Sequence, residues 1–291
     1  MRKLSVVIFS LCLIRVAAAQ TESPVANEAA RADSSVGGEA APTESAVAGA
    51  VAPAVPPYRS VAAVPKPKHS GGIHWGPLLR DWWVNLVMDQ TVRIVKEPKT
   101  RNALSGPFFH DWFRTVSTYN FTRWNDDDKF ITSNLGHPAQ GAIVAAIFWQ
   151  NNDHVRFSDQ DFHSAAYRKA LLQAFLFVTF DAVQWKLGPL SESSIGNVGL
   201  PAHWWEQPRN CKKFNLPCDP RTGLNDLLLN EVGGTAMTIG FQWLDKHVQK
   251  RIEKRVQSRA LIDTTRILTN PPQSVANIVR FRRPWFRDSR P

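Results

Sequence analysis

The side chains best suited to acid–base chemistry in this sequence are one histidine and two carboxylates. His137 lies in the segment Gly136-His-Pro-Ala-Gln-Gly141, Asp226 lies in a later Asn-Asp-Leu segment, and Glu192 lies between the two. An imidazole titrates near neutral pH, and burial can bring the pKa of a carboxyl group into the same range. His137 with Asp226 or Glu192 could therefore supply a general acid and a general base. The sequence contains no G-x-S-x-G, H-E-x-x-H or Walker loop, so this hypothesis rests on residue type alone.

The same side chains can instead form a structural network between helices. Polar residues on a helix face that meets other helices are costly unless they have partners, so they mark either a network or a site. The network hypothesis joins five side chains that would hold helices in register: His137, Asp181, Glu192, Asp226 and Asn230. Asn225 is a further candidate binding residue. We favour this non-enzymatic hypothesis over a membrane-surface enzyme acting on a lipid or phosphorylated glycan, and a lipid-binding accessory is the third alternative.

The stretch from residue 222 to 244 is predicted to be a helix with polar groups beside a seam of small residues. At about 100° per residue, Asp226, Asn230 and Gly233-Gly234 share one face. Glycines let a second helix approach closely. We therefore expect the Asn225-Asp226 end of this helix to meet the start of the helix that carries His137.

Apolar residues at helical spacing predict several other helices. The expected helices cover residues 77–96, 107–119, 139–150 and 159–187, with the helix over 222–244 continuing to 256 and a further turn or two over 261–268. Pro138 suits a first helical position, Ser158 a helix cap, and the Asn270-Pro-Pro segment a helix end. These elements predict an all-α domain over residues 70–268, a bundle of about five or six helices, followed by a basic aromatic tail over 269–291.

The N-terminal region is typical of an exported protein. Residues 1–19 combine a basic start, an uncharged apolar run and an Ala-Ala-Ala end, which indicates a signal peptide, although an uncleaved anchor is the alternative. Residues 20–69 are rich in Ala, Pro, Ser and Glu and are expected to be a disordered tether.

The cysteines that follow the expected cleavage site are Cys211 and Cys218. In an oxidising compartment this pair predicts a disulfide, with two free thiols as the alternative. His203 is the one histidine nearby and no further cysteine accompanies it, so zinc is a poor alternative. We predict neither a metal nor a cofactor.

The charge balance indicates an anionic partner. The formal net charge is +10, and loss of Arg2, Lys3 and Arg15 with a signal peptide leaves +7. No nucleic-acid motif occurs, so lipid head groups or lipopolysaccharide are the expected partners and nucleic acid is not. Arg282 and Arg283, which stand among aromatic residues of the tail, are candidate contacts to such a surface.

The apolar runs leave the relation to the membrane open. The runs over 139–149, 170–180 and 232–244 are shorter than the ~20 residues of a standard span. Stripes of Trp and Phe suit a membrane interface, although such stripes also build cores. We expect a helical bundle that is embedded in a membrane or seated on it.

Two motifs resemble those of a known family. The Gly136-His-Pro-x-x-Gly141 box and the later Asn225-Asp-Leu and Gly233-Gly234 boxes are similar to those of a family of uncharacterised bacterial envelope proteins. A fainter similarity links Glu192, Asp226, Asn230 and Gly234 to VanZ-like membrane proteins. These resemblances imply an exported, periplasm-facing and membrane-associated protein of the bacterial cell envelope, without an assigned activity.

Overall fold

The computed structural model describes residues 72–96, 100–101, 104–117, 119, 121–122, 124, 130–153, 161–195 and 223–287. Within these residues the regular elements are all helices, and an isolated β-bridge joins Ile73 and Asn152. The predicted all-α class is therefore confirmed. The expected signal peptide, the tether and the Cys211–Cys218 pair lie outside the described residues.

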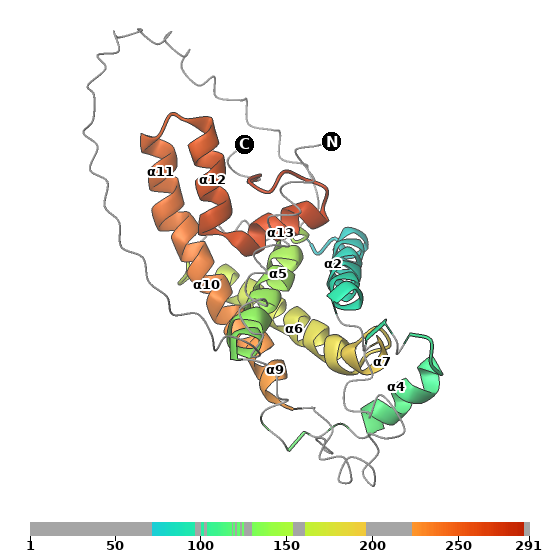
Figure 1. Ribbon diagram of the computed structural model, residues 1–291. Helices are drawn as coiled ribbons and strands as arrows, with labels where there is room; N and C mark the ends of the chain where they lie inside the picture. Colours follow the sequence, from blue (N-terminus) through green and yellow to red (C-terminus); the bar gives the residue numbers. More distant parts are fainter. Residues whose placement is uncertain are drawn as a thin grey trace, which may run out of the picture.

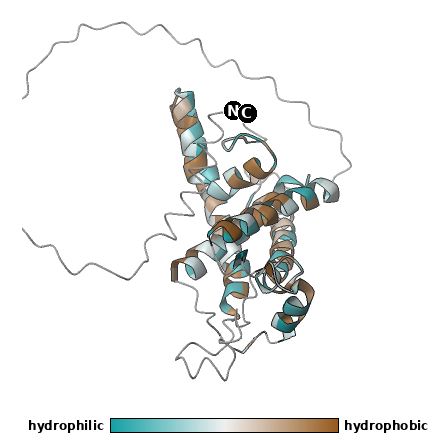
Figure 2. Cartoon of the chain, turned by 45° about the vertical axis from the view of Figure 1, so that its right-hand side comes forward, coloured by the Kyte–Doolittle hydropathy of each residue, from teal (hydrophilic) through white to brown (hydrophobic). Residues whose placement is uncertain are grey.

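Helix α5 (His137–Gln150) lies at the centre of the bundle (Figure 1). Its residues from Gly141 to Trp149 are all buried, because this helix is apolar or small on every side. Four elements pack around it: α2 (Trp75–Lys96), α6 (Ala165–Leu187), α10 (Gly234–Leu244) and α13 (Pro271–Val279). Hydrophobic residues occur along the outer helices as well as in the centre (Figure 2).

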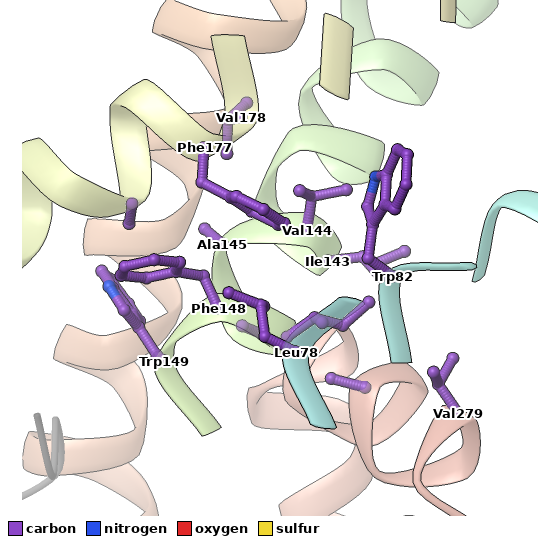
Figure 3. Close-up of a cluster of buried hydrophobic side chains, with 14 of the residues drawn as sticks. Leu78, Trp82, Ile143, Val144, Ala145, Phe148, Trp149, Phe177, Val178 and Val279 are labelled. Atoms are coloured by element: carbon purple, nitrogen blue, oxygen red, sulfur yellow. The ribbon is translucent and has the colours of Figure 1, made fainter. Parts of the chain in front are cut away.

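The hydrophobic core forms where α2, α6 and α13 meet α5. Figure 3 shows Leu78 and Trp82 of α2 facing residues of α5, with Phe177 on the α6 side. The rings of Phe148 and Phe177 lie 5.5 Å apart, in the tilted arrangement that aromatic pairs favour. This core fixes α5 between its neighbours and so positions both ends of α5.

One continuous helical path runs from residue 225 to 255. It comprises α9 (Asn225–Leu228), η3 (Leu229–Gly233), α10, η4 (Asp245–Gln249) and α11 (Lys250–Arg255). The predicted helix and its continuation are thus confirmed. The two π-helical segments, η3 and η4, are features that periodicity did not predict.

The helix that carries His137 begins earlier than expected. A π-helical turn, η1 (Thr132–Gly136), leads directly into α5, whose predicted start was Pro138. Pro138 has no amide hydrogen and its ring crowds the preceding turn, so a widened turn accommodates it. The proline therefore lies within a continuous helix.

Helix α6 begins at a different cap from the one predicted. Ser164 is the N-cap, and its hydroxyl accepts a hydrogen bond from the Tyr167 amide. The assignment of Ser158 as the cap was wrong, and Ser158 itself lies outside the described residues. The helix ends at Leu187 before Gly188, as predicted.

The boundary between the domain and a tail at residue 269 was also wrong. After α12 (Arg259–Thr269), the Asn270 side chain accepts a hydrogen bond from the Gln273 amide and caps α13. Pro271 and Pro272 occupy the first turn of α13, where proline is tolerated, so they start a helix instead of ending one. Ala276 and Val279 of α13 then join the core.

Two shorter elements complete the bundle. Helix α4 (Phe108–Ser117) packs against α7 (Glu192–Ile195) at the end of the molecule opposite to α11 and α12 (Figure 1). The helices α7 and α13 were not among the five or six expected.

Among the helices that the structure describes, none combines the length and the apolar content needed to cross a membrane.

Candidate functional site

The candidate site lies where the start of α5 meets the end of α6 and the starts of α7 and α9. His137 Nε2 lies 2.9 Å from Asp226 Oδ2. Lys186 Nζ lies 2.5 Å from the same Asp226 oxygen and 2.8 Å from Glu192 Oε2. The structure therefore brings together the three residues proposed for acid–base chemistry, and it adds Lys186, which sequence reasoning missed.

Local structure fixes Glu192 beside Lys186. The Trp185 indole donates a 2.9 Å hydrogen bond to Glu192 Oε1, while Lys186 takes the other carboxylate oxygen. Ser193 donates to the Lys186 carbonyl oxygen at 2.6 Å. The chain reversal between α6 and α7 thus places the carboxylate of Glu192 against the end of α6.

Two serines hold the turn before α7. The Ser194 hydroxyl accepts from the Ser191 amide at 2.8 Å, and the Ser191 hydroxyl accepts from the Ser194 amide at 3.2 Å. This reciprocal pair satisfies two backbone donors at a helix start, as a capping box does.

Glycines allow α5 and the helical path of Asp226 to approach closely. A Cβ atom on Gly233 would lie 2.8 Å from Pro138 Cγ, and one on Gly234 would lie 2.8 Å from Gly141 Cα. A Cβ on Gly141 would lie 2.0 Å from the Asn230 carbonyl oxygen. The expected meeting of the Asn225-Asp226 end with the His137 helix start, through a glycine seam, is confirmed.

A π-helical turn flanks each member of the His137–Asp226 pair. η1 precedes His137 directly, and η3 begins three residues after Asp226. Such turns are uncommon within α-helices and occur often at functional sites.

Neighbouring charges keep the buried Glu192 carboxylate ionised. The Asp226 side chain has no solvent exposure, and those of Lys186, His137 and Glu192 are 6%, 12% and 13% exposed. Burial alone would raise the pKa of Glu192, but the charges of Lys186, Arg93 and His137 and the hydrogen bond from Lys186 outweigh it, so the pKa is lowered. Glu192 is therefore a poor proton donor at neutral pH.

Asp181 belongs to a different polar group, which corrects the single network predicted. Its carboxylate accepts a 2.7 Å hydrogen bond from the Trp82 indole. Burial raises the pKa of Asp181 to about 7; the Trp82 hydrogen bond opposes this shift and the Asp89 charge adds to it. Asp89 in turn accepts from Asn85 at 3.1 Å and from Gln140 at 2.5 Å.

The two asparagines have structural contacts. Asn225 Oδ1 accepts a hydrogen bond from the Asp226 amide at 2.8 Å, so it fixes the start of α9 beside the site. Asn230 Oδ1 faces the α5 backbone, because it would lie 2.9 Å from a Cβ on Gly141. Asn230 therefore packs in the helix seam and does not join the Lys186 cluster, which corrects a second member of the predicted network.

Arg282 and Arg283 are exposed and lie at the other end of α5. The Arg282 amide donates to the Asn277 carbonyl oxygen at 2.8 Å, and Asn277 Oδ1 accepts from Gln150, the last residue of α5, at 2.8 Å. The 14 residues of α5 separate its ends by about 20 Å. These two arginines therefore do not form part of a site with His137.

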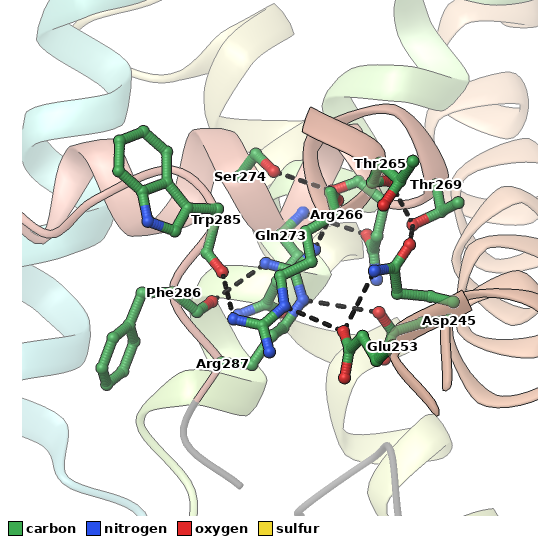
Figure 4. Close-up of polar contacts among 12 residues, drawn as sticks. Asp245, Glu253, Thr265, Arg266, Thr269, Gln273, Ser274, Trp285, Phe286 and Arg287 are labelled. Carbon is green, nitrogen blue, oxygen red and sulfur yellow. Dashed lines mark hydrogen bonds and ion pairs between the residues drawn. The ribbon is translucent and has the colours of Figure 1, made fainter. Parts of the chain in front are cut away.

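Buried ion pairs hold the C-terminal helices together (Figure 4). Arg266 Nε lies 2.8 Å from Glu253 Oε1, and Arg287 Nε lies 3.4 Å from Asp245 Oδ1. Arg287 also donates to the Arg266 carbonyl oxygen at 2.6 Å. These contacts tie Arg287 to η4 and α12, and α12 to α11. No group of three or more His, Cys, Asp and Glu side chains with the geometry of a metal site occurs in the described part of the chain.

The chain matches no family model, no curated protein and no solved structure.

Proposed function

We propose that this protein is a non-enzymatic, membrane-associated component of the bacterial cell envelope, in which an ion network centred on Lys186 holds α5, α6, α7 and α9 in register. The observation that supports this most directly is that the Lys186 ammonium group contacts the carboxylates of both Glu192 and Asp226. The expected signal peptide and the resemblance to envelope proteins support the location.

A network role agrees with the burial of the charges. Because a buried charge that loses its partner is strongly destabilising, a cluster of this kind favours one arrangement of the helices over its alternatives. Asp226 reaches no solvent, and the lowered pKa of Glu192 keeps it ionised. Neither carboxylate is well placed to exchange a proton with a substrate.

The membrane association is supported by aromatic residues on the outer surface. Trp83, Trp243, Phe109 and Phe113 are each at least half exposed. Exposed aromatic residues in such number are unusual for a protein surface that faces only water, and they suit the boundary between lipid and water.

Substitution of Lys186 tests the network role. We expect Lys186→Met to lower the free energy of unfolding of the detergent-purified full chain by about 3–5 kcal/mol, because Asp226 and Glu192 then lose their buried cation. The matched control is Lys169→Met on the exposed face of the same helix, for which we expect a change within about 0.5 kcal/mol. Equal effects of the two substitutions would refute the proposal.

A second candidate function is an enzyme on a lipid or phosphorylated glycan. The two π-helical turns beside His137 and Asp226, and the partial exposure of His137, favour it. His137 would act as the general base and Asp226 would orient its ring. Incubation with an envelope lipid extract, followed by mass spectrometry, tests this: turnover by the wild type that His137→Gln abolishes without loss of stability would replace the non-enzymatic proposal.

A lipid-binding accessory role is the third proposal. Native mass spectrometry of the detergent-purified chain would reveal a co-purifying lipid, and its absence would count against this role.

A further inference from the structure

Three of the helices around α5 carry polar residues on their inner faces and apolar residues on their outer faces. Helix α6 shows this most clearly. From residue 170 to 187 its exposed positions are all apolar: Leu172, Leu176, Phe180 and Val183. Its two ionisable side chains in this stretch, Asp181 and Lys186, are buried. A helix at a water-facing surface has the opposite arrangement, with its charges outside.

The path from α9 through α10 repeats the pattern. Its buried side chains include Asp226, Asn230, Thr238 and Gln242, which recur at helical spacing. The large hydrophobic side chains on its outer face are exposed: Leu228, Val232, Ile239 and Trp243. Glu231 is the one ionisable side chain from 227 to 244, and burial raises its pKa.

Helix α2 is the third case. Asp81, Asn85 and Asp89 are buried; Asp89 accepts a hydrogen bond from Gln140 of α5, and Asp81 accepts one from Asn151 at the end of α5. Between residues 81 and 92 no charged residue is exposed, whereas Trp83, Val87 and Met88 are.

The three outer faces are neighbours. The rings of Trp82 in α2 and Phe180 in α6 lie 5.4 Å apart. Near the start of α6, the Tyr167 hydroxyl donates a 3.0 Å hydrogen bond to Gln242 of α10. Because α2, α6 and α10 all pack around the buried helix α5, their outer faces point in different directions. We call these faces, with the exposed side chains named above, the apolar arc.

We infer that the apolar arc is covered by the acyl chains of an anionic lipid membrane. Flat contact with a second protein copy would cover one helix face, whereas lipid can cover a surface that curves around the bundle. The inward ionisable groups agree with this, since ionisable residues at membrane depth face the bundle interior and pair there. The inference rests on the membrane association proposed above and identifies the surface that makes it.

Basic residues at the limits of the arc indicate the kind of head group. Arg168 and Lys169 are exposed directly before the apolar stretch of α6, and Lys96 is exposed at the end of α2. Beyond α10, Arg251 and Lys254 are exposed on α11. Lysine and arginine at such limits contact anionic head groups while their neighbours contact acyl chains.

Vesicle flotation with matched glutamate variants tests the inference. The full chain is reconstituted with phosphatidylcholine vesicles that contain phosphatidylglycerol. We expect the wild type to float, and Leu176→Glu or Ile239→Glu to lower the bound fraction at least about tenfold, because a charge is costly among acyl chains. The control is Leu268→Glu, at a leucine of α12 outside the arc that is more exposed than Leu176, with an expected change below about twofold.

A conservative variant gives a second reading that does not depend on a new charge. The difference in tryptophan fluorescence between wild type and Trp243→Phe isolates the signal of Trp243, and lipids with brominated acyl chains should quench that signal.

If the wild type floats while Leu176→Glu behaves like Leu268→Glu and Trp243 is not quenched, the arc inference fails and membrane association stands. If the wild type does not float, both fail. A dimer without lipid that Leu176→Glu dissociates would also overturn the inference, in favour of a second copy.

Discussion

Lys186 shows how one buried side chain can decide the packing of several helices. It contacts Asp226 of α9 and Glu192 of α7 from the last turn of α6. Sequence reasoning did not select it, because a lysine near the C-terminal end of a helix is expected there for its favourable interaction with the helix dipole. No local signal distinguishes that role from a buried one. His137 and Asp226 were selected by residue type, and the glycines in their two helices predicted that these helices would meet.

Asp181 makes the stability of the fold depend on pH. Its pKa is 3.8 in the unfolded chain and about 7 in the folded protein, so the folded state holds a proton that the unfolded state loses between these values. Asp181 contributes its full stabilisation below about pH 4, and this contribution disappears as the pH rises through about 7. The free energy of unfolding then falls by up to about 4 kcal/mol. Denaturant titrations from pH 4 to 8 should show that the free energy of unfolding of Asp181→Asn does not decline in this way.

An exposed aspartate provides the control for this pH dependence. Asp161 lies outside the buried network, and Asp161→Asn should leave the wild-type decline unchanged. Glu192, with its lowered pKa, contributes in the opposite direction: its stabilisation is present above its unfolded pKa and is lost as the pH falls. A decline in Asp181→Asn equal to that of the wild type would show that another group causes it.

At the scale of elements, the glycine seam between α5 and η3 is the feature that brings His137 to Asp226. The seam was predictable, because small residues at helical spacing on both partners indicate close packing. The π-helical turns and the start of α5 before Pro138 were not, since hydrophobic periodicity does not distinguish a widened turn from a loop. Asn270-Pro-Pro was misinterpreted for a related reason, because proline suits the first turn of a helix as well as its end.

Substitution of Gly141 tests the seam. A Cβ atom at Gly141 would lie 2.0 Å from a backbone oxygen of Asn230, so α5 and η3 would have to separate. We expect Gly141→Ala to destabilise the protein by about 1–3 kcal/mol or more in thermal or denaturant unfolding. At Gly240, where a Cβ would meet nothing within 4 Å, alanine should stabilise the helix by about 0.5–1 kcal/mol. Equal effects at the two positions would contradict a tight seam.

Truncation tests the place of α13 in the domain. A chain that ends at residue 268 loses Ala276 and Val279 from the core, together with the Arg287 contact to Asp245. We expect this chain to be unfolded by circular dichroism and protease digestion. A chain that ends at residue 287 keeps all of these groups and should match the full chain. A stable domain ending at 268 would restore the boundary that the sequence predicted.

At the scale of the whole molecule, α2, α6 and α10 bury polar side chains beside the hydrophobic core and carry apolar side chains on their outer faces. The fold class and the meeting of His137 with Asp226 were predictable, because helical spacing and glycine pairs are local patterns. The outward placement of apolar side chains on these three helices was not predictable. Apolar periodicity identifies an apolar stripe on a helix, but it does not show whether that stripe faces the core or the outside. Asp181 and Lys186 show this: they share the buried face of α6 with Ala174 and Phe177.

The most direct test of the central claim is a double-mutant cycle between Lys186 and Asp226, measured by global unfolding of the full chain. If the network holds four helices in register, Lys186→Met and Asp226→Asn should each lower the free energy of unfolding, and the double variant should lose less than the sum of the two. We expect a coupling free energy of about 2–3 kcal/mol, within the range for residues in one ion network. Additive losses, with a coupling below about 0.5 kcal/mol, would contradict the claim.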